Sequence, residues 1–362
     1  MNPTLLRRIL IALAGIALAL AVGPFLLVGN YTQFIIALLA IAFIAVLSVN
    51  MLAGLCGIWS LGHSAYVAIG AYMAANLTLL GVPLEVIIVA SMVSSALLGF
   101  ILGLSAGRFS VLYFGLLTMA LAMVATVVIG RWTAVTGGGD GKKVGRALTI
   151  FLSGPIESKN AVVICVLLAT AVYLIGDAVQ ASRFGRRWLA VKGQRIASMV
   201  MGLKPHVENA TAFGLSAALA SLSGIGMAFS ISFIDPVAFS LDSSVTMIVG
   251  TVVGGIGSSL GALLGAGFIT AVPELARDAR AVANFVYGGA MIAVLLWLGQ
   301  GIVPAIRTRI RKVQGRNRPK TDGSRKAVDT AAIGSLVSRL LPPAEHTLSL
   351  NPSLSHGTTN MN

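Results

Sequence analysis

Long apolar runs separated by short polar segments dominate the pattern of this chain. The runs cover approximately residues 9–28, 32–52, 59–80, 83–106, 111–130, 161–181, 207–233, 243–271 and 282–304. Most of them approach the length of about 20 residues that an α-helix needs to cross about 30 Å of hydrocarbon. The pattern therefore predicts an all-α polytopic membrane protein, inserted as several helices that cross the bilayer in alternating directions.

One of these runs, 243–271, is too long for a single straight helix. It contains the glycine-rich stretch 254–259, and glycine is a poor helix former. We expect two short helices or a re-entrant pair here, at 243–256 and 259–272. The predicted total is then about ten membrane helices.

Composition and charge support a membrane protein and indicate how it is oriented. Hydrophobic residues make up 56% of the chain and charged residues 10%, whereas soluble domains carry about 25% charged residues. The positive charge is concentrated in a basic segment, Ser182–His206, which has six Lys or Arg and no acid, and in the tail from Ala305 onward. Cationic loops stay on the cytoplasmic side, so this excess charge requires no nucleic-acid partner.

Counting crossings from the cytoplasmic Arg7 and Arg8 gives the topology. The loop 131–160 falls outside despite its cations, and the basic segment 182–206 falls inside. We expect a transmembrane domain at 1–304 and a basic, mostly disordered cytoplasmic tail at 305–362, where polar residues dominate. Both termini are predicted to be cytoplasmic.

Polar residues and glycines interrupt the predicted span between Gly54 and Tyr72. Irregular backbone at membrane depth is tolerated where protein buries it or where it lines a water-filled cavity. Two interpretations are therefore open, tight helix packing and a lining for the translocation pathway. The candidate pathway residues in this segment are Ser60, His63, Ser64 and Tyr72. His63 has no acidic residue within a helical turn, so we expect a structural or pathway-lining role and no catalysis.

Two further glycine-rich segments carry competing interpretations. In Gly250–Gly267 the glycines favour close helix packing, or else a broken helix beside the pathway, in which case Gly254 and Gly255 are candidate lining residues. The segment Thr136–Lys143 superficially resembles a phosphate-binding loop, but its spacing and its context do not fit that motif. We expect a flexible external loop there.

Catalytic and metal-binding constellations are missing from the sequence. We find no Ser/His/Asp set, no paired carboxylates, no metal-ligand cluster and few ionisable groups in the spans. The pattern argues against an enzyme and against an ion-coupled carrier, which usually buries charged residues. No nucleotide-binding domain is present either. If transport is active, ATP must be bound by partner subunits and not as a cofactor of this chain, and the basic segment is the surface where such partners would dock.

Several segments, in order, resemble the permease subunits of branched-chain amino-acid ABC importers, in particular the LivM-type subunit. They span roughly residues 30–304. The resembling segments are Ser60–His63 with Gly70–Tyr72, Leu112–Thr118, Thr136–Gly141, Ser182–Gly185 with Ala197–Leu203, Val253–Gly261 and Pro273–Leu275. The resemblance is specific through the number and order of these segments.

The resemblance implies a type-II-like importer permease of about ten helices in a bacterial inner membrane. It implies four kinds of contact: a second permease subunit, two cytoplasmic ATP-binding subunits, a periplasmic binding protein and membrane lipid. Thr118 would then join the candidate pathway residues. The basic segment would couple to the ATPase through Arg186, Arg187, Arg195, Ala197, Met201 and Gly202.

The sequence departs from the family pattern at three positions. The coupling stretch of the family commonly carries acids where this chain has Arg195 and Met199, which implies an ATPase groove of different charge. A glutamate common in the span after Leu112–Phe114 is replaced by Met123. Importers for urea or short amides therefore stay open as alternatives. A stand-alone secondary carrier, a membrane enzyme and an assembly scaffold are further alternatives that the shortage of buried charge and of catalytic groups disfavours.

Overall fold

A computed structural model describes residues 29–106, 109, 111–145, 148–150, 154–156, 161–275, 288, 289 and 292. This part of the chain is mostly helical, and five of its helices are long and apolar enough to cross a membrane. The five are α2 (Asn30–Cys56), α4 (Leu84–Ser105), α5 (Val111–Arg131), α7 (Ala161–Ala181) and α10 (Pro205–Ile231). The predicted helical membrane fold is confirmed in these segments.

Shorter elements connect the long helices. The shorter helices are α3 (His63–Leu79), α6 (Thr133–Thr136), η1 (Gly138–Asp140), α8 (Arg183–Gly193), α9 (Arg195–Val200), η3 (Pro236–Phe239), α11 (Leu241–Gly254) and α12 (Ser259–Leu275). The strands are β1 (Lys142–Lys143), β2 (Leu148–Ile150), β3 (Gly154–Ile156) and β4 (Phe233–Ile234). Strands β2 and β3 form a hairpin in which Thr149 pairs with Pro155.

The break predicted within 243–271 is confirmed. Helix α11 ends at Gly254 and α12 begins at Ser259, with Gly255 (φ 111°) and Gly257 (φ 77°) in the link. Glycine adopts these positive φ values without the steric strain of a Cβ atom. The total of about ten helices stays a prediction, because the run 9–28, the tail 305–362 and nearly all of 282–304 lie outside the described residues.

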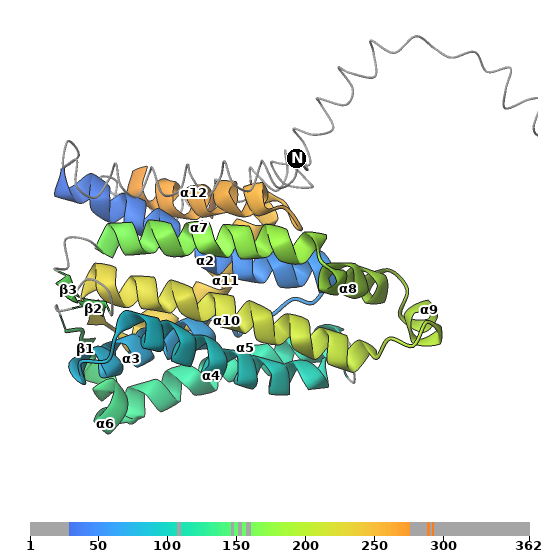
Figure 1. The fold of residues 1–362 in the computed structure, drawn as a ribbon, viewed down its shortest axis with the longest axis horizontal. Helices are drawn as coiled ribbons and strands as arrows, with labels where there is room; N and C mark the ends of the chain where they lie inside the picture. Colours follow the sequence, from blue (N-terminus) through green and yellow to red (C-terminus); the bar gives the residue numbers. More distant parts are fainter. Residues whose placement is uncertain are drawn as a thin grey trace, which may run out of the picture. The chain divides into compact units, whose positions relative to one another are not determined.

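Two groups of connecting segments lie at opposite ends of the helices. Strand β1 pairs antiparallel with β4, with Lys142 opposite Ile234, so the loop after α5 and the link after α10 share one end. Helices α8 and α9 lie at the other end (Figure 1). The sides of the membrane assigned to these two groups by counting crossings stay a prediction.

The glycine-rich segment 136–143 has more regular structure than the flexible loop that we expected. It forms the end of α6, the turn η1 and strand β1, with positive φ at Gly137, Gly138 and Gly141. A Cβ atom on Gly141 would lie 2.6 Å from the carbonyl oxygen of Ile234. Glycine therefore allows this loop to pack directly against β4.

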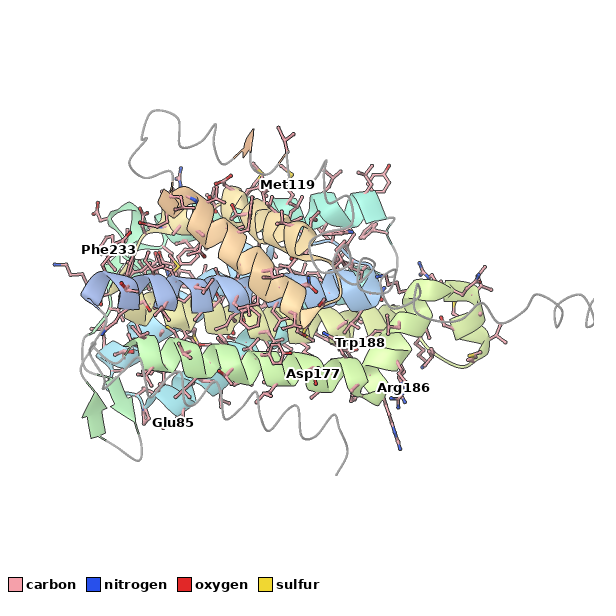
Figure 2. The ribbon with its side chains drawn as sticks, turned by 90° about the horizontal axis from the view of Figure 1, so that it is seen from above. Glu85, Met119, Asp177, Arg186, Trp188 and Phe233 are labelled. Atoms are coloured by element: carbon pink, nitrogen blue, oxygen red, sulfur yellow. The ribbon has the colours of Figure 1, made fainter. Side chains whose placement is uncertain are left out.

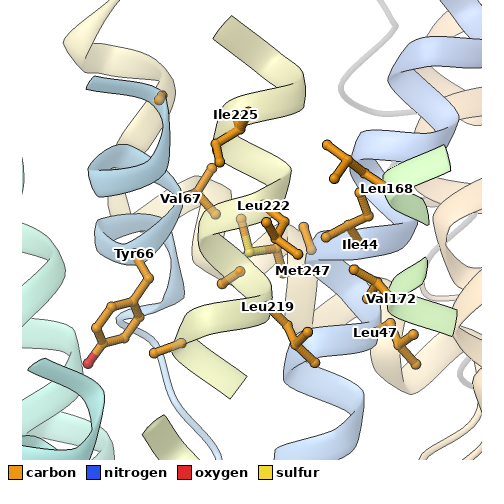
Figure 3. Close-up of a cluster of buried hydrophobic side chains, with 14 of the residues drawn as sticks. Ile44, Leu47, Tyr66, Val67, Leu168, Val172, Leu219, Leu222, Ile225 and Met247 are labelled. Atoms are coloured by element: carbon orange, nitrogen blue, oxygen red, sulfur yellow. The ribbon is translucent and has the colours of Figure 1, made fainter. Parts of the chain in front are cut away.

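Helices α2 and α10 form the centre of the bundle. In an 18-residue apolar stretch of each helix, the buried share is 89% for α10 and 72% for α2, whereas it is 22% for α5. Leu47 of α2, Val67 of α3 and Leu222 of α10 meet in the same core (Figure 3). Small residues bring α3 and α10 close together, since a Cβ atom on Gly70 would lie 1.9 Å from the carbonyl oxygen of Ser221.

Candidate functional site

The link between α2 and α3 is an unwound segment inside the helical bundle. Helix α2 ends at Gly57, whose φ of 71° is left-handed, and α3 begins at His63. The backbone N–H of Leu61 donates to Oγ1 of Thr118 on α5 at 3.1 Å. Ser60 is buried, and its Oγ accepts from the N–H of Gly62 at 3.3 Å. Two of the candidate pathway residues thus hold the unwound link in place.

We expect Thr118→Val to lower the free energy of unfolding by about 1–3 kcal/mol. Valine keeps the shape of threonine but leaves the partly buried N–H of Leu61 without its acceptor. Thr118→Ser, which keeps the oxygen, is the matched control. Thermal denaturation of both variants in detergent measures the difference, and equal stability of the two would contradict the role assigned to the Thr118 hydroxyl.

His63 is fully buried and its hydrogen bond defines its protonation. Its Nε2 lies 2.7 Å from Oγ of Ser216, and that hydroxyl donates to the carbonyl oxygen of Ser48 at 2.7 Å. A hydroxyl has a single proton to donate, so Nε2 of His63 carries the proton that joins the two side chains. Nδ1 has no hydrogen-bond partner within the described ranges. This fixed geometry favours the structural interpretation of His63.

Ser64 and Tyr72 occupy two different environments along α3. Ser244 of α11 accepts from the backbone N–H of Ser64 at 2.9 Å and donates to its Oγ at 2.8 Å. The ring of Tyr72 lies 5.8 Å from that of Phe239, and its hydroxyl has no partner in the described part of the chain. Ser64 therefore ties α3 to α11, whereas Tyr72 packs against the η3 turn.

A cavity of about 430 Å³ lies among α2, α3, α10, η3, α11 and α12. Its walls are mainly apolar, with Ile41, Val67 and Met247 among the lining residues, and Glu274 contributes a carboxylate. Tyr31 donates its hydroxyl hydrogen to this carboxylate. Of the seven candidate pathway residues, Ser64 alone lines the cavity, so the cavity does not bring the candidates together.

Gly254 and Gly255 lie at the break between α11 and α12. A Cβ atom on Gly254 would lie 1.9 Å from the carbonyl oxygen of Gly261, which makes this residue part of a close helix contact. The carbonyl oxygen of Gly255 accepts from Nδ2 of Asn50 at 3.0 Å. The structure therefore has both the close helix packing and the broken helix that the sequence suggested. That Gly254 and Gly255 line the pathway stays a prediction.

The basic segment Ser182–His206 folds into α8 and α9. Oγ of Ser182 accepts from the N–H of Gly185 at 3.3 Å and caps the start of α8. Trp188 is buried, and its Nε1 donates to Oγ1 of Thr211 on α10 at 3.3 Å. Arg186 extends away from the bundle (Figure 2). Trp188 of α8 therefore packs against the bundle, whereas Arg186 of the same helix faces outward.

Helix α9 presents apolar side chains that the rest of the described chain does not cover. Ile196 is 75% exposed, Val200 85% and Met201 80%. The helix ends in a Schellman motif at Gly202, whose φ is 82°, with the N–H of Leu203 donating to the carbonyl oxygen of Ser198 at 3.0 Å. Exposed apolar patches are typical of surfaces that contact another protein or the membrane.

The candidate coupling residues all lie on or beside this surface. Arg187 of α8 is 3.8 Å from Glu208 of α10; the arginine side chain is 52% exposed and the glutamate side chain 12%. Arg195 and Ala197 are exposed on α9, and Gly202 is exposed just after it. The structure brings these residues together with Met201 at one end of the bundle.

Several residues with structural contacts at these sites were missed at the level of sequence. Nζ of Lys192 on α8 donates to the carbonyl oxygen of Gly54 at 2.7 Å and to that of Ala53 at 3.2 Å. Asn50, a fully buried amide on α2, bridges the α11–α12 link. A signal existed for Asn50, because polar residues inside an apolar span are rare and usually have a purpose.

Comparisons with known proteins add an independent finding. The family model described as "Branched-chain amino acid transport system / permease component" matches residues 31–295. The chain is 26% identical over 322 residues to the high-affinity branched-chain amino acid transport system permease protein LivM of Escherichia coli, covering 82% of this chain and 76% of the relative. It is 27% identical over 294 residues to the LivM protein of Salmonella typhimurium, covering 75% and 69%. No solved structure matches at a comparable level.

Proposed function

This chain belongs to the branched-chain amino acid transport permease family, and from that premise we propose that it is the permease subunit of an ATP-driven importer for branched-chain or similar amino acids. It is a multi-pass membrane transport component and not an enzyme. In the proposed assembly it forms the translocation pathway, and partner subunits hydrolyse the ATP.

The observation that carries the proposal is the exposed apolar tip of α9. Apolar side chains that face water are unfavourable unless a partner covers them, and the neighbouring cations of α8 and α9 would complement an acidic groove. Helix α8 packs against α2, α7 and α10, so a partner seated on α9 would act directly on the bundle. A cytoplasmic ATP-binding subunit fits these requirements.

The remainder of the proposed assembly follows the family. We propose a second permease subunit, two ATP-binding subunits and a periplasmic binding protein, in a bacterial inner membrane with both termini cytoplasmic. The permease domain is proposed to span residues 1–304 as about ten helices in a type-II-like arrangement, followed by a disordered tail at 305–362. Ser60, His63, Ser64, Tyr72, Thr118, Gly254 and Gly255 are proposed pathway residues.

The test is uptake of labelled leucine by vesicles reconstituted with this chain and its proposed partners. We expect uptake to require both ATP and the binding protein. Competition by urea or a short amide, with no competition by valine or isoleucine, would instead support the alternative substrate class. Uptake driven by an ion gradient with no ATP-binding subunit present would contradict the proposal and favour a stand-alone carrier.

A further inference from the structure

Lys192 connects the segment that carries α9 to the centre of the bundle. Much of this residue is exposed on α8, yet its amine reaches the last turn of α2 and contacts the carbonyl oxygens of Ala53 and Gly54. The end of a helix presents unpaired carbonyl groups with partial negative charge, which a cation stabilises. Lys192 therefore acts as a charged cap on α2, supplied by a different helix.

The absence of a side chain at Gly57 leaves space for the aliphatic part of Lys192. A Cβ atom on Gly57 would lie 3.3 Å from Cγ of Lys192, and the φ of 71° at Gly57 ends α2 at this point. Gln194 is the single residue between α8 and α9. Gly193 and Gln194 alone separate Lys192 from the first residue of α9, so a displacement of α9 would act on Lys192 through a very short connection.

The same end of α2 is joined to the α11–α12 link. A Cβ atom on Gly54 would lie 2.5 Å from Cα of Gly257, so the two backbones are in direct contact. Asn50 donates from Nδ2 to the carbonyl oxygen of Gly255 at 3.0 Å, and its Oδ1 accepts from the N–H of Gly257 at 2.9 Å. The side chain of one buried residue thus satisfies one carbonyl oxygen and one N–H group of the link between α11 and α12.

A further hydrogen bond joins the end of α7 to the start of α12. Nε2 of Gln180, near the end of α7, lies 3.1 Å from Oγ of Ser259, the first residue of α12. Helix α7 leads into α8 through Ser182. The end of α2, the break between α11 and α12, and the segment α7–α8 therefore form one continuous network of contacts.

We propose that Lys192 and Asn50 are positioning residues that transmit movement of α9 to the α11–α12 break. The inference rests on the proposed docking of an ATP-binding subunit at α9. When such a subunit moves α9, the lysine amine moves with α8 and either holds or releases the last turn of α2. Asn50 lies one turn earlier on α2, so it carries that movement to Gly255 and Gly257. The coupling travels through hydrogen bonds and rigid helices in contact.

The experiment compares Lys192→Met with Lys192→Arg in the complete importer reconstituted in vesicles. We measure three quantities: co-purification of the ATP-binding subunits, stimulation of their ATPase activity by the loaded binding protein, and leucine uptake. For Lys192→Met we expect normal co-purification, with loss of stimulation and a fall in uptake on the order of tenfold. Arginine can still donate to the α2 carbonyls, so Lys192→Arg should retain most of the uptake.

Two further variants separate transmission from docking and from folding. Asn50→Ala should show the same pattern as Lys192→Met, although Asn50 is buried and distant in sequence from α9. Lys204→Met removes a charge from the docking segment without touching α2, so we expect any loss of uptake in this variant to be matched by an equal loss of co-purification. If the Lys192→Met permease is not recovered as a folded protein, Lys192→Gln, which keeps an N–H donor without the charge, takes its place. Its uptake, divided by the amount of ATP-binding subunit that co-purifies, is then compared with that of Lys192→Arg.

The outcomes distinguish this inference from the proposed function. Unchanged stimulation and uptake in Lys192→Met or Lys192→Gln would overturn the inference while the docking role of α9 stands. A parallel loss of co-purification and uptake would also overturn it, since Lys192 would then belong to the docking surface. A wild-type complex that neither binds ATPase subunits nor requires ATP would refute the proposed function and this inference with it.

Discussion

Met201→Glu is expected to abolish co-purification of the ATP-binding subunits with this permease. Met201 is 80% exposed beside Val200 and Ile196 at the tip of α9. A partner that covers this tip would have to bury the new carboxylate in an apolar contact. Truncation or disruption of a central interface side chain costs about 2 kcal/mol or more, which is roughly a 30-fold loss of affinity.

The matched control is Val237→Glu at the opposite end of the bundle. Val237 is 69% exposed in η3, which follows directly after β4, the strand that pairs with β1 at the end of the bundle opposite α9. We expect this variant to retain the ATP-binding subunits at the level of the unmodified chain. Quantitative pull-down from detergent-solubilised membranes gives both values. Retention of the ATPase in Met201→Glu would remove the main support for the docking role of α9.

Gly202→Glu tests the same surface by disturbing the backbone conformation that ends α9. The φ of 82° at Gly202 closes the Schellman motif that ends α9. A residue with a Cβ atom in this left-handed conformation costs about 1–2 kcal/mol. The variant should therefore weaken co-purification even when Met201 is intact, and a combined Met201→Glu and Gly202→Glu variant should show none.

Gly265→Ala is expected to destabilise the protein more than any other glycine-to-alanine change in α12. A Cβ atom at this position would lie 1.8 Å from the carbonyl oxygen of Gly250 on α11. Because the obstacle is backbone, α11 and α12 must separate, and overpacking of this kind costs about 1–3 kcal/mol. Gly254→Ala meets the same obstacle at the carbonyl oxygen of Gly261.

Gly267→Ala is the control, since it lies two residues further along the same helix. No atom lies within 4 Å of a Cβ atom built there, and alanine is the better helix former. We expect this variant to keep or slightly raise the thermal stability measured by size-exclusion chromatography after heating. If Gly265→Ala and Gly267→Ala melt at the same temperature, the two helices are not held at the distance described here.

The long elements were predictable from the sequence because their signal is local. The apolar runs near 32–52, 83–106, 111–130 and 161–181 correspond closely to α2, α4, α5 and α7. The glycines of 254–257 marked the α11–α12 break for the same reason. The hydrophobic period identifies a helix, and clustered glycine interrupts it, without knowledge of any partner segment.

Contacts between distant segments were not predictable in this way. Nothing in the sequence around Ser216 indicates that it accepts from His63, and nothing near Lys192 indicates that it caps α2. The pairing of β1 with β4 was missed because each strand has two residues, too few for a periodic signal. The site candidates were chosen by residue type, which is why Ser64 lines the cavity while Tyr72 packs against η3.

The pairing of β1 with β4 also has a consequence for the order of synthesis. Lys142 and Ile234 are about ninety residues apart, and α7 and α10 are both made between them. Strand β1 therefore has no partner until α10 has been inserted and β4 reaches the same side of the bilayer. Pairing of β1 with β4 would show that α7 and α10 have both been inserted. Cross-linking of residues 142 and 234 in nascent chains of increasing length would therefore time the insertion of α10.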